Sequence, residues 1–131
     1  MISLDLARRL TQDAGVLWEP QSGDRFVIDA TLLTGEVFWI SNLTIEPQHF
    51  ADQTVLGFNG TTEWALDSVG LDQALWLPRE DQLRTLLGDR LETLRRTSEG
   101  WEVTYATSDG TRHTVNDLDV ECAYAKALLT L

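Results

Sequence analysis

The sequence contains one cysteine, three prolines and no long run of apolar residues. The single cysteine, Cys122, cannot form an intramolecular disulfide, which fits a protein of the reducing cytoplasm. A membrane-spanning helix needs about 18 or more consecutive apolar residues, and no stretch of the chain approaches that length. The first residues also lack the apolar core and cleavage site of a secretory signal. We therefore expect a cytoplasmic protein that does not cross a membrane.

Basic residues are missing from the middle of the chain, where no lysine or arginine occurs from Phe26 to Pro78. We call this stretch the base-free segment. An acidic surface with aromatic side chains suits the docking of a basic protein or peptide, because aromatic residues anchor interfaces and complementary charge steers the encounter. The segment holds all four phenylalanines, the tryptophans Trp39, Trp64 and Trp76, and the acids Asp29, Glu36, Glu46, Asp52, Glu63, Asp67 and Asp72.

The net charge of −11 excludes some partners and leaves others open. Nucleic-acid binding requires clustered lysine and arginine for phosphate contacts, and anionic membrane surfaces attract basic segments. We therefore expect neither a nucleic-acid nor a membrane partner. Basic proteins, basic peptides and cations remain open, and the alternative is that the charge only keeps the protein soluble.

A length of 131 residues, of which 43% are hydrophobic, predicts a single domain over residues 1–131. The element order is helix, strands, helix, strands, helix. It predicts an α+β fold with mainly antiparallel sheet and with N-terminal, middle and C-terminal helices. Ser3, Pro78 and Asn116 mark the helix starts, and glycine ends the first two helices. The helices are expected at about residues 3–15, 78–87 and 117–130. The expected buried stripe is Leu6, Ala7, Leu10 and Ala14 in the first helix and Leu83, Leu86 and Leu87 in the second. In the third helix it is Leu118, Cys122, Ala125 and Leu129.

Strands are expected where branched and aromatic residues alternate with turn residues. The clearest local signal is Asn59-Gly60, which favours the type I′ turn of a hairpin because both residues adopt positive φ at low cost. Pro47 is expected to end a strand, and Ser68–Gln73 is expected to form a loop. The predicted strands cover residues 25–29, 36–41, 43–46, 54–58, 61–66 and 74–77, and a three-stranded meander covers 91–115 with turns at 98–100 and 108–110.

No familiar catalytic or cofactor motif occurs in the sequence. A Gly-rich phosphate loop is missing, and two histidines with one cysteine cannot form a familiar zinc site. His49 and His113 have no paired nucleophile and are more often structural residues. We therefore expect no cofactor, and the sequence favours a binding protein over an enzyme.

The best acidic cluster consists of Glu63, Asp67 and Asp72. Glu63 and Asp67 lie four residues apart and share a strand face if the strand extends that far, so they could bind a hard cation or act as an acid–base pair. The alternative is that Asp67 and Asp72 are ordinary turn residues around Gly70.

Four of the five tryptophans separate into two groups. Trp101 alternates with buried-type residues and is expected in the core. The others of interest, Trp39, Trp64 and Trp76, suit a core or an interface equally well, and core packing is favoured for at least two of them.

Four segments of the sequence carry a resemblance to a known family. These are the first ten residues, Trp18-Glu19-Pro20, Gly57–Leu66 and Leu75–Leu83. They resemble small uncharacterised bacterial proteins to which a pilus-assembly label is sometimes attached. The Trp-Leu-Pro-x-x-Asp-Gln-Leu segment is also similar to one in small phage-encoded proteins of unknown function. The resemblance covers nearly the whole chain and implies no catalytic residues. The pilus label implies a relative of P-loop ATPases, and this sequence has no such loop.

The leading hypothesis is a non-enzymatic, acidic-aromatic binding or accessory protein whose partner is a basic protein or peptide. The candidate binding residues are Trp39, Trp64, Trp76, Glu63, Asp67 and Asp72. One alternative is a small carboxylate-dependent enzyme or divalent-cation-binding protein that uses the three acids. Another is a homo-oligomeric structural protein whose tryptophans form the interface between copies.

Overall fold

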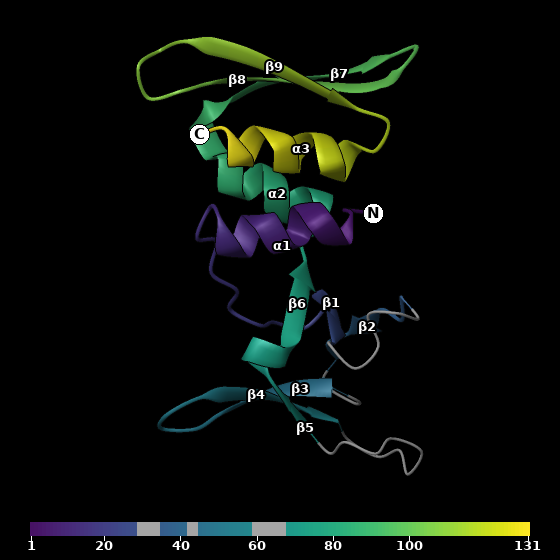
Figure 1. Ribbon diagram of the computed structural model, residues 1–131, viewed down its shortest axis with the longest axis vertical. Helices are drawn as coiled ribbons and strands as arrows, with labels where there is room; N and C mark the ends of the chain where they lie inside the picture. Colours follow the sequence, from purple (N-terminus) through teal and green to yellow (C-terminus); the bar gives the residue numbers. More distant parts are fainter. Residues whose placement is uncertain (29–34, 42–44, 59–67) are drawn as a thin grey trace. The chain divides into compact units, whose positions relative to one another are not determined.

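The computed structural model describes residues 1–28, 35–41, 45–58 and 68–131. The chain forms two compact units: unit 1 consists of Met1–Leu17 with Pro78–Leu131, and unit 2 consists of Trp18–Leu77. The architecture is α+β, with antiparallel sheets and with N-terminal, middle and C-terminal helices (Figure 1). The sequence prediction of the fold class is therefore confirmed, and a single domain over residues 1–131 stays a prediction.

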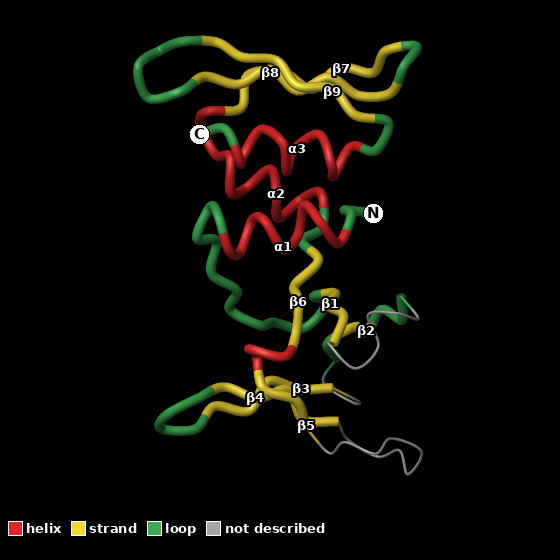
Figure 2. Tube along the Cα trace, viewed as in Figure 1, coloured by secondary structure: helices red, strands yellow, loops and turns green. Residues whose placement is uncertain are grey.

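Unit 1 combines three helices with one antiparallel sheet of order β7-β8-β9. The helix α3 packs against β8 and β9, and both α1 and α2 pack against α3. Figure 2 shows these helices together on one side of the meander. The elements are α1 (Leu4–Gln12), α2 (Glu80–Leu87), the short 3₁₀ turn η3 (Gly88–Arg90), β7 (Leu91–Thr97), β8 (Gly100–Ala106), β9 (Arg112–Asp117) and α3 (Val120–Leu129).

The start of α1 and the end of α2 follow the local signals in the sequence, whereas α1 ends at Gln12, before Gly15, and α2 begins at Glu80, after Pro78. The Ser3 hydroxyl accepts a hydrogen bond from the Leu6 N–H at 3.2 Å, which caps α1. Gly88 adopts a φ of +56° directly after α2, a conformation that glycine allows at little cost. The apolar stripes are only partly buried, because Ala14 and Leu86 are exposed. Their predicted burial was wrong.

The start of α3 differs from the prediction. Asn116 lies in β9, opposite Glu102 of β8. The cap is Asp119, whose carboxylate accepts the Cys122 N–H at 3.0 Å. Because the helix starts later, Leu118 precedes it and is 82% exposed rather than buried. Cys122 and Ala125 are buried, as predicted.

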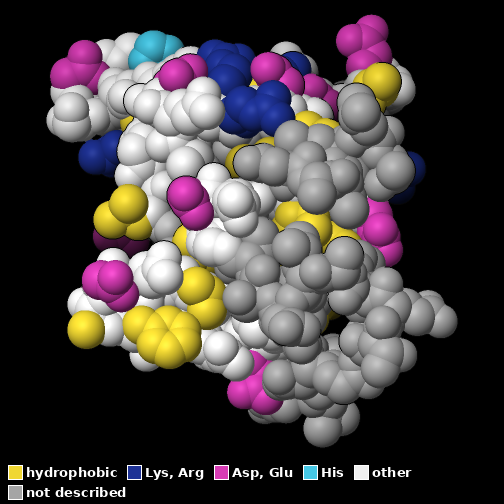
Figure 3. Space-filling model, turned by 60° about the horizontal axis from the view of Figure 1, so that its bottom comes forward, with side chains coloured by type: hydrophobic (Ala, Val, Ile, Leu, Met, Phe, Trp, Pro, Cys, Tyr) yellow, Lys and Arg dark blue, Asp and Glu magenta, His cyan; other side chains and the backbone are white. Residues whose placement is uncertain are grey.

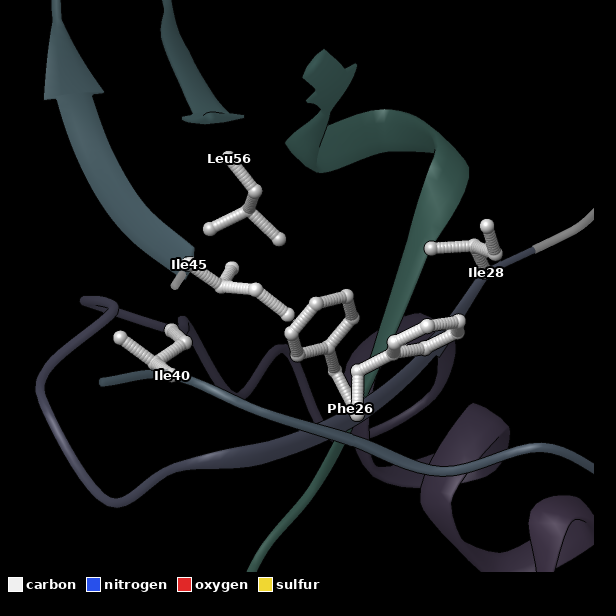
Figure 4. Packing of buried hydrophobic residues seen from close by; sticks show 6 residues of the cluster. Phe26, Ile28, Ile40, Ile45 and Leu56 are labelled. Atoms are coloured by element: carbon white, nitrogen blue, oxygen red, sulfur yellow. The ribbon is translucent and has the colours of Figure 1, made fainter. Parts of the chain in front are cut away.

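The described residues of unit 2 form two small antiparallel sheets, of order β2-β1-β6 and β3-β4-β5. One face of the first sheet packs into a core with Ile45 of β3 and Leu56 of β4 (Figure 4). That cluster also includes Phe26, Ile28, Phe38 and Ile40. The elements are β1 (Arg25–Ile28), β2 (Phe38–Trp39), β3 (Ile45–His49), β4 (Thr54–Phe58), β5 (Ser68–Gly70), the short 3₁₀ turn η2 (Leu71–Gln73) and β6 (Ala74–Leu77).

Two strand predictions in unit 2 were wrong. Pro47 lies inside β3, opposite Leu56, rather than at its end. An edge strand tolerates proline because part of its N–H groups have no ladder partner, and β3 is at the edge of its sheet. The expected loop at Ser68–Gln73 is instead β5 followed by η2.

The predicted turn at Asn59-Gly60 lies outside the described residues, as does the predicted strand at 61–66. The described register places Gly57 of β4 opposite Ser68 of β5. A two-residue turn at Asn59-Gly60 would place Gly57 opposite Thr62. The pairing of β4 therefore differs from the one that this turn requires.

Candidate functional site

The acidic character of the chain is concentrated in unit 2. Residues 18–77 contain nine acids and a single basic residue, Arg25, so their formal charge is −8. The other residues contain twelve acids and nine bases, which leaves −3 of the total of −11. The base-free segment seen in the sequence is thus most of one structural unit.

Arg25 is used inside unit 2. Arg25 is buried, and its Nε donates a hydrogen bond to the Leu77 backbone oxygen at 3.3 Å. Its guanidinium carbon lies 5.7 Å from the centroid of the Trp39 ring, within the range of a cation–π interaction. This geometry follows from the sheet register, because β1 pairs Arg25 with Trp39 on one side and with Leu77 on the other. Unit 2 therefore has no exposed lysine or arginine that could neutralise its acids.

Two of the described aromatic side chains of unit 2 are exposed. Trp39 in β2 is 52% exposed, and Phe50 is 58% exposed. Phe50 starts the turn of the β3–β4 hairpin, in which its N–H donates to the Gln53 carbonyl oxygen at 2.8 Å. The exposed carboxylate of Asp52 lies in the same turn. Figure 3 shows hydrophobic and acidic side chains next to each other on the surface near this hairpin.

Trp76 belongs to the interior rather than to a binding surface. It is buried in β6 and stacks on Trp18, with ring centroids 6.2 Å apart and an interplanar angle of 3°. The Trp18 Nε1 donates a hydrogen bond to Asp24 at 2.9 Å. The Trp76 Nε1 is buried without a hydrogen-bond partner among the described residues. The stacked pair thus packs the core of unit 2.

The proposed acid cluster cannot be assembled from the described residues. Glu63, Asp67 and Trp64 lie outside them, and Asp72 is exposed in η2. Within the described part of the chain, no group of three or more His, Cys, Asp or Glu side chains could hold a metal ion. The cation-binding and carboxylate-enzyme alternatives therefore stay predictions.

A pocket of about 430 Å³ opens beside the stacked tryptophans. Trp18, Pro20 and Leu71 form its apolar part, and His49 and Glu19 form its polar part. The His49 Nδ1 lies 3.1 Å from the Thr54 hydroxyl, so the imidazole is held by a hydrogen bond across the hairpin. An aromatic wall next to a carboxylate can accommodate the long apolar stem and the charge of a lysine or arginine side chain.

Three features of this surface were not predicted from the sequence. Phe50 could have been found, since an aromatic residue directly before Ala51-Asp52-Gln53 lies beside a turn. Arg25 could also have been noticed as the base that directly precedes the base-free segment. The pocket brings together residues from 18–21, 49–54 and 71, and no local pattern predicts that contact.

No helix in the described part of the chain is long and apolar enough to cross a membrane. A scan against protein-family models, a search of curated proteins and a search of solved structures found no match. The resemblance to small bacterial proteins therefore stays a prediction.

Proposed function

We propose that unit 2 is a docking module for a basic protein or peptide, and that the protein acts as a non-enzymatic binding or accessory factor in the cytoplasm. The observation that carries this proposal is an exposed Trp39 on a unit of charge −8 whose one arginine is buried. Solubility alone accounts for the acids but gives no reason to expose two aromatic rings.

The aromatic residues and the acids have different physical roles in such a complex. Buried aromatic anchors carry much of the energy of an interface, whereas surrounding charge mainly raises the association rate and selects the partner. Trp39 and Phe50 are the proposed anchors. The ring of Trp39 already attracts the guanidinium of Arg25, and the same ring quadrupole attracts a cation of a partner.

The pocket beside Trp18 supports the same class of partner. A lysine or arginine side chain that entered it would lay its methylene groups against Trp18 and bring its charge near Glu19. An acidic or neutral peptide would lack this charge pairing.

The test uses a short labelled arginine-rich peptide and a glutamate-rich peptide of equal length. Fluorescence anisotropy should show binding of the first peptide only, with a dissociation constant that rises as salt is added. Trp39→Ala should weaken binding at least about tenfold, as expected for an anchor residue. Leu118→Ala is the matched control because Leu118 is exposed on unit 1, and it should bind like the wild type.

Folding must be separated from binding in this test. Trp39→Ala leaves Arg25 its hydrogen bond to Leu77, so we expect a loss of no more than about 1–2 kcal/mol of stability from the removed cation–π contact. Phe50→Ala supplies a second variant at an exposed turn and should also weaken binding. The proposal is wrong if both variants bind the basic peptide like the wild type, or if the acidic peptide binds equally well.

A further inference from the structure

The three helices of unit 1 each leave part of a predicted apolar stripe uncovered at the same place. Ala14, just after α1, and Leu86 in α2 are exposed, and Leu129 in α3 is only half-buried. All three line one pocket of about 370 Å³. An amphipathic stripe that continues past its core needs another apolar surface to bury it.

Further apolar side chains extend this pocket into a groove. We define the leucine groove as Ala14, Val16, Leu86, Leu128, Leu129 and Leu131. Leu17 follows Val16 in the chain and is 87% exposed. Figure 1 shows that the ends of α1 and α2 and the C-terminus lie at the same end of the helical layer. Several exposed leucines at one place are typical of an interaction surface, whereas single ones are ordinary.

The polar residues of the groove are one acid and one base, Asp13 and Arg90. The Asp13 carboxylate lies 3.7 Å from Arg9, and both side chains are at least half exposed, so this ion pair contributes little to stability. Arg90 is exposed and makes no ion pair within the described residues. A surface with one charge of each sign can match itself, because a two-fold rotation brings each charge opposite the other.

We propose that the leucine groove is the interface at which a second copy of this chain binds in a two-fold symmetric dimer. Leu86 and Leu129 of the two copies bury each other, and Asp13 of each copy pairs with Arg90 of its partner. Net charge favours this surface for self-association, because unit 1 carries −3 whereas unit 2 carries −8. A strongly acidic or strongly basic partner surface would match only one of these two charges and would be repelled by the other.

The size of the groove sets the expected affinity. Stable complexes bury about 800 Å² on each partner, and a patch of a few leucines at the end of a helical layer is smaller. We therefore expect a weak dimer whose population rises with protein concentration across the micromolar range.

The test is sedimentation velocity of the full chain over that concentration range. The wild type should shift from monomer to dimer. Leu86→Asp should raise the dimer dissociation constant at least about tenfold, because it buries a charge in the centre of the interface. Leu118→Asp is the control, an exposed leucine of unit 1 outside the groove, and should leave the dimer intact.

A charge exchange distinguishes the proposed contact from general stickiness. Arg90→Glu should weaken the dimer because it places two acids opposite each other, and Asp13→Arg combined with Arg90→Glu should restore it. Circular dichroism melting of each variant alone confirms that the monomers are folded. The proposal is overturned if the wild type stays monomeric at the highest concentration. It is also overturned if Leu86→Asp and Arg90→Glu leave the dimer unchanged.

Discussion

Asp119 joins the start of the chain to the start of α3, and its replacement tests how unit 1 is held together. Its carboxylate accepts the Cys122 N–H at 3.0 Å and forms an ion pair of 2.6 Å with the Met1 amino group. The neighbouring Glu121 accepts the N–H groups of Ile2 and Glu80 at 2.9 and 3.1 Å. Two carboxylates at the start of α3 therefore bind both the first two residues of the chain and the first turn of α2.

The magnitude can be worked out from the two contacts of Asp119. Loss of a helix N-cap costs about 1 kcal/mol, with a range of about 0.5–2. The ion pair adds little, about 0–1 kcal/mol, because the two side chains are 44% and 34% exposed to solvent. Asp119→Ala should therefore lower the free energy of unfolding by about 1–2 kcal/mol. Asp119→Asn keeps a capping oxygen, so it should lose only the smaller contribution, which is that of the ion pair.

The pH dependence of this difference has a defined direction. Burial raises the pKa of Asp119, but the hydrogen bonds from the Met1 amine and the Cys122 N–H outweigh burial and lower the pKa below its usual value of 3.8. A carboxyl with a lowered folded-state pKa stabilises the protein above its unfolded pKa, and this contribution is lost as the pH falls through the folded pKa. The difference in the free energy of unfolding between wild type and Asp119→Asn should have its full size above about pH 4 and should decrease below that pH.

Urea unfolding at several pH values measures these differences. Asp89→Ala is the matched control, because Asp89 is exposed in η3 and should change stability by no more than about 0.5 kcal/mol. The reasoning is refuted if Asp119→Ala unfolds at the same urea concentration as the wild type. It is also refuted if the difference between wild type and Asp119→Asn grows as the pH falls.

Two further predictions concern unit 1. Gly100→Ala should destabilise the protein by more than about 2 kcal/mol, because Gly100 has a φ of +122° and an added Cβ would lie 2.5 Å from the Asp117 carbonyl oxygen. Gly110 has a φ of +84° but open space around an added Cβ, so Gly110→Ala should cost only about 1 kcal/mol. Equal melting temperatures of the two variants would contradict this prediction. Burial raises the pKa of the Cys122 thiol, so a thiol reagent at neutral pH should label Cys122 only after urea unfolds the chain, and rapid labelling of the native protein would show that the thiolate is accessible.

Helix starts could be predicted from the sequence where one residue dominates the local choice. Ser3 is such a residue, and its side chain caps α1 as expected. Near α3, Asn116, Asp117 and Asp119 can all cap a helix. The choice among them depends on how far β9 continues along β8, and this tertiary pairing through Asp117 delays the helix to Val120.

Burial of a helical side chain could be predicted only where neighbouring elements extend far enough to cover the apolar stripe of the helix. Leu83 and Leu87 of α2 are buried, whereas Leu86 on the same predicted stripe is 40% exposed. Periodicity identifies the apolar side of a helix, but it does not tell how far the neighbouring elements extend along that side. Ala14 differs from its prediction for the same reason, and both residues now line the leucine groove.

The tryptophans show the same limit for the candidate site. Trp39 and Trp76 pair with adjacent residues of β1, Arg25 and Phe26, and successive residues of a strand point to opposite faces. Phe26 faces the core, so Trp76 is buried beside it, whereas Trp39 shares the face of Arg25. The composition of the segment predicted an aromatic surface, but the sheet register decided which tryptophan is exposed.

Salt separates the two proposed surfaces experimentally. Docking of a basic partner on unit 2 depends on a charge of −8, and this long-range attraction is screened beyond about 8 Å at physiological ionic strength. The dimer depends mainly on buried leucines, and its surface ion pairs contribute about 0–1 kcal/mol each. Raising the salt concentration should therefore weaken peptide binding strongly and change the dimer dissociation constant much less. If both respond to salt to the same degree, one surface serves both interactions, and the assignment of docking to Trp39 and of self-association to Leu86 is wrong.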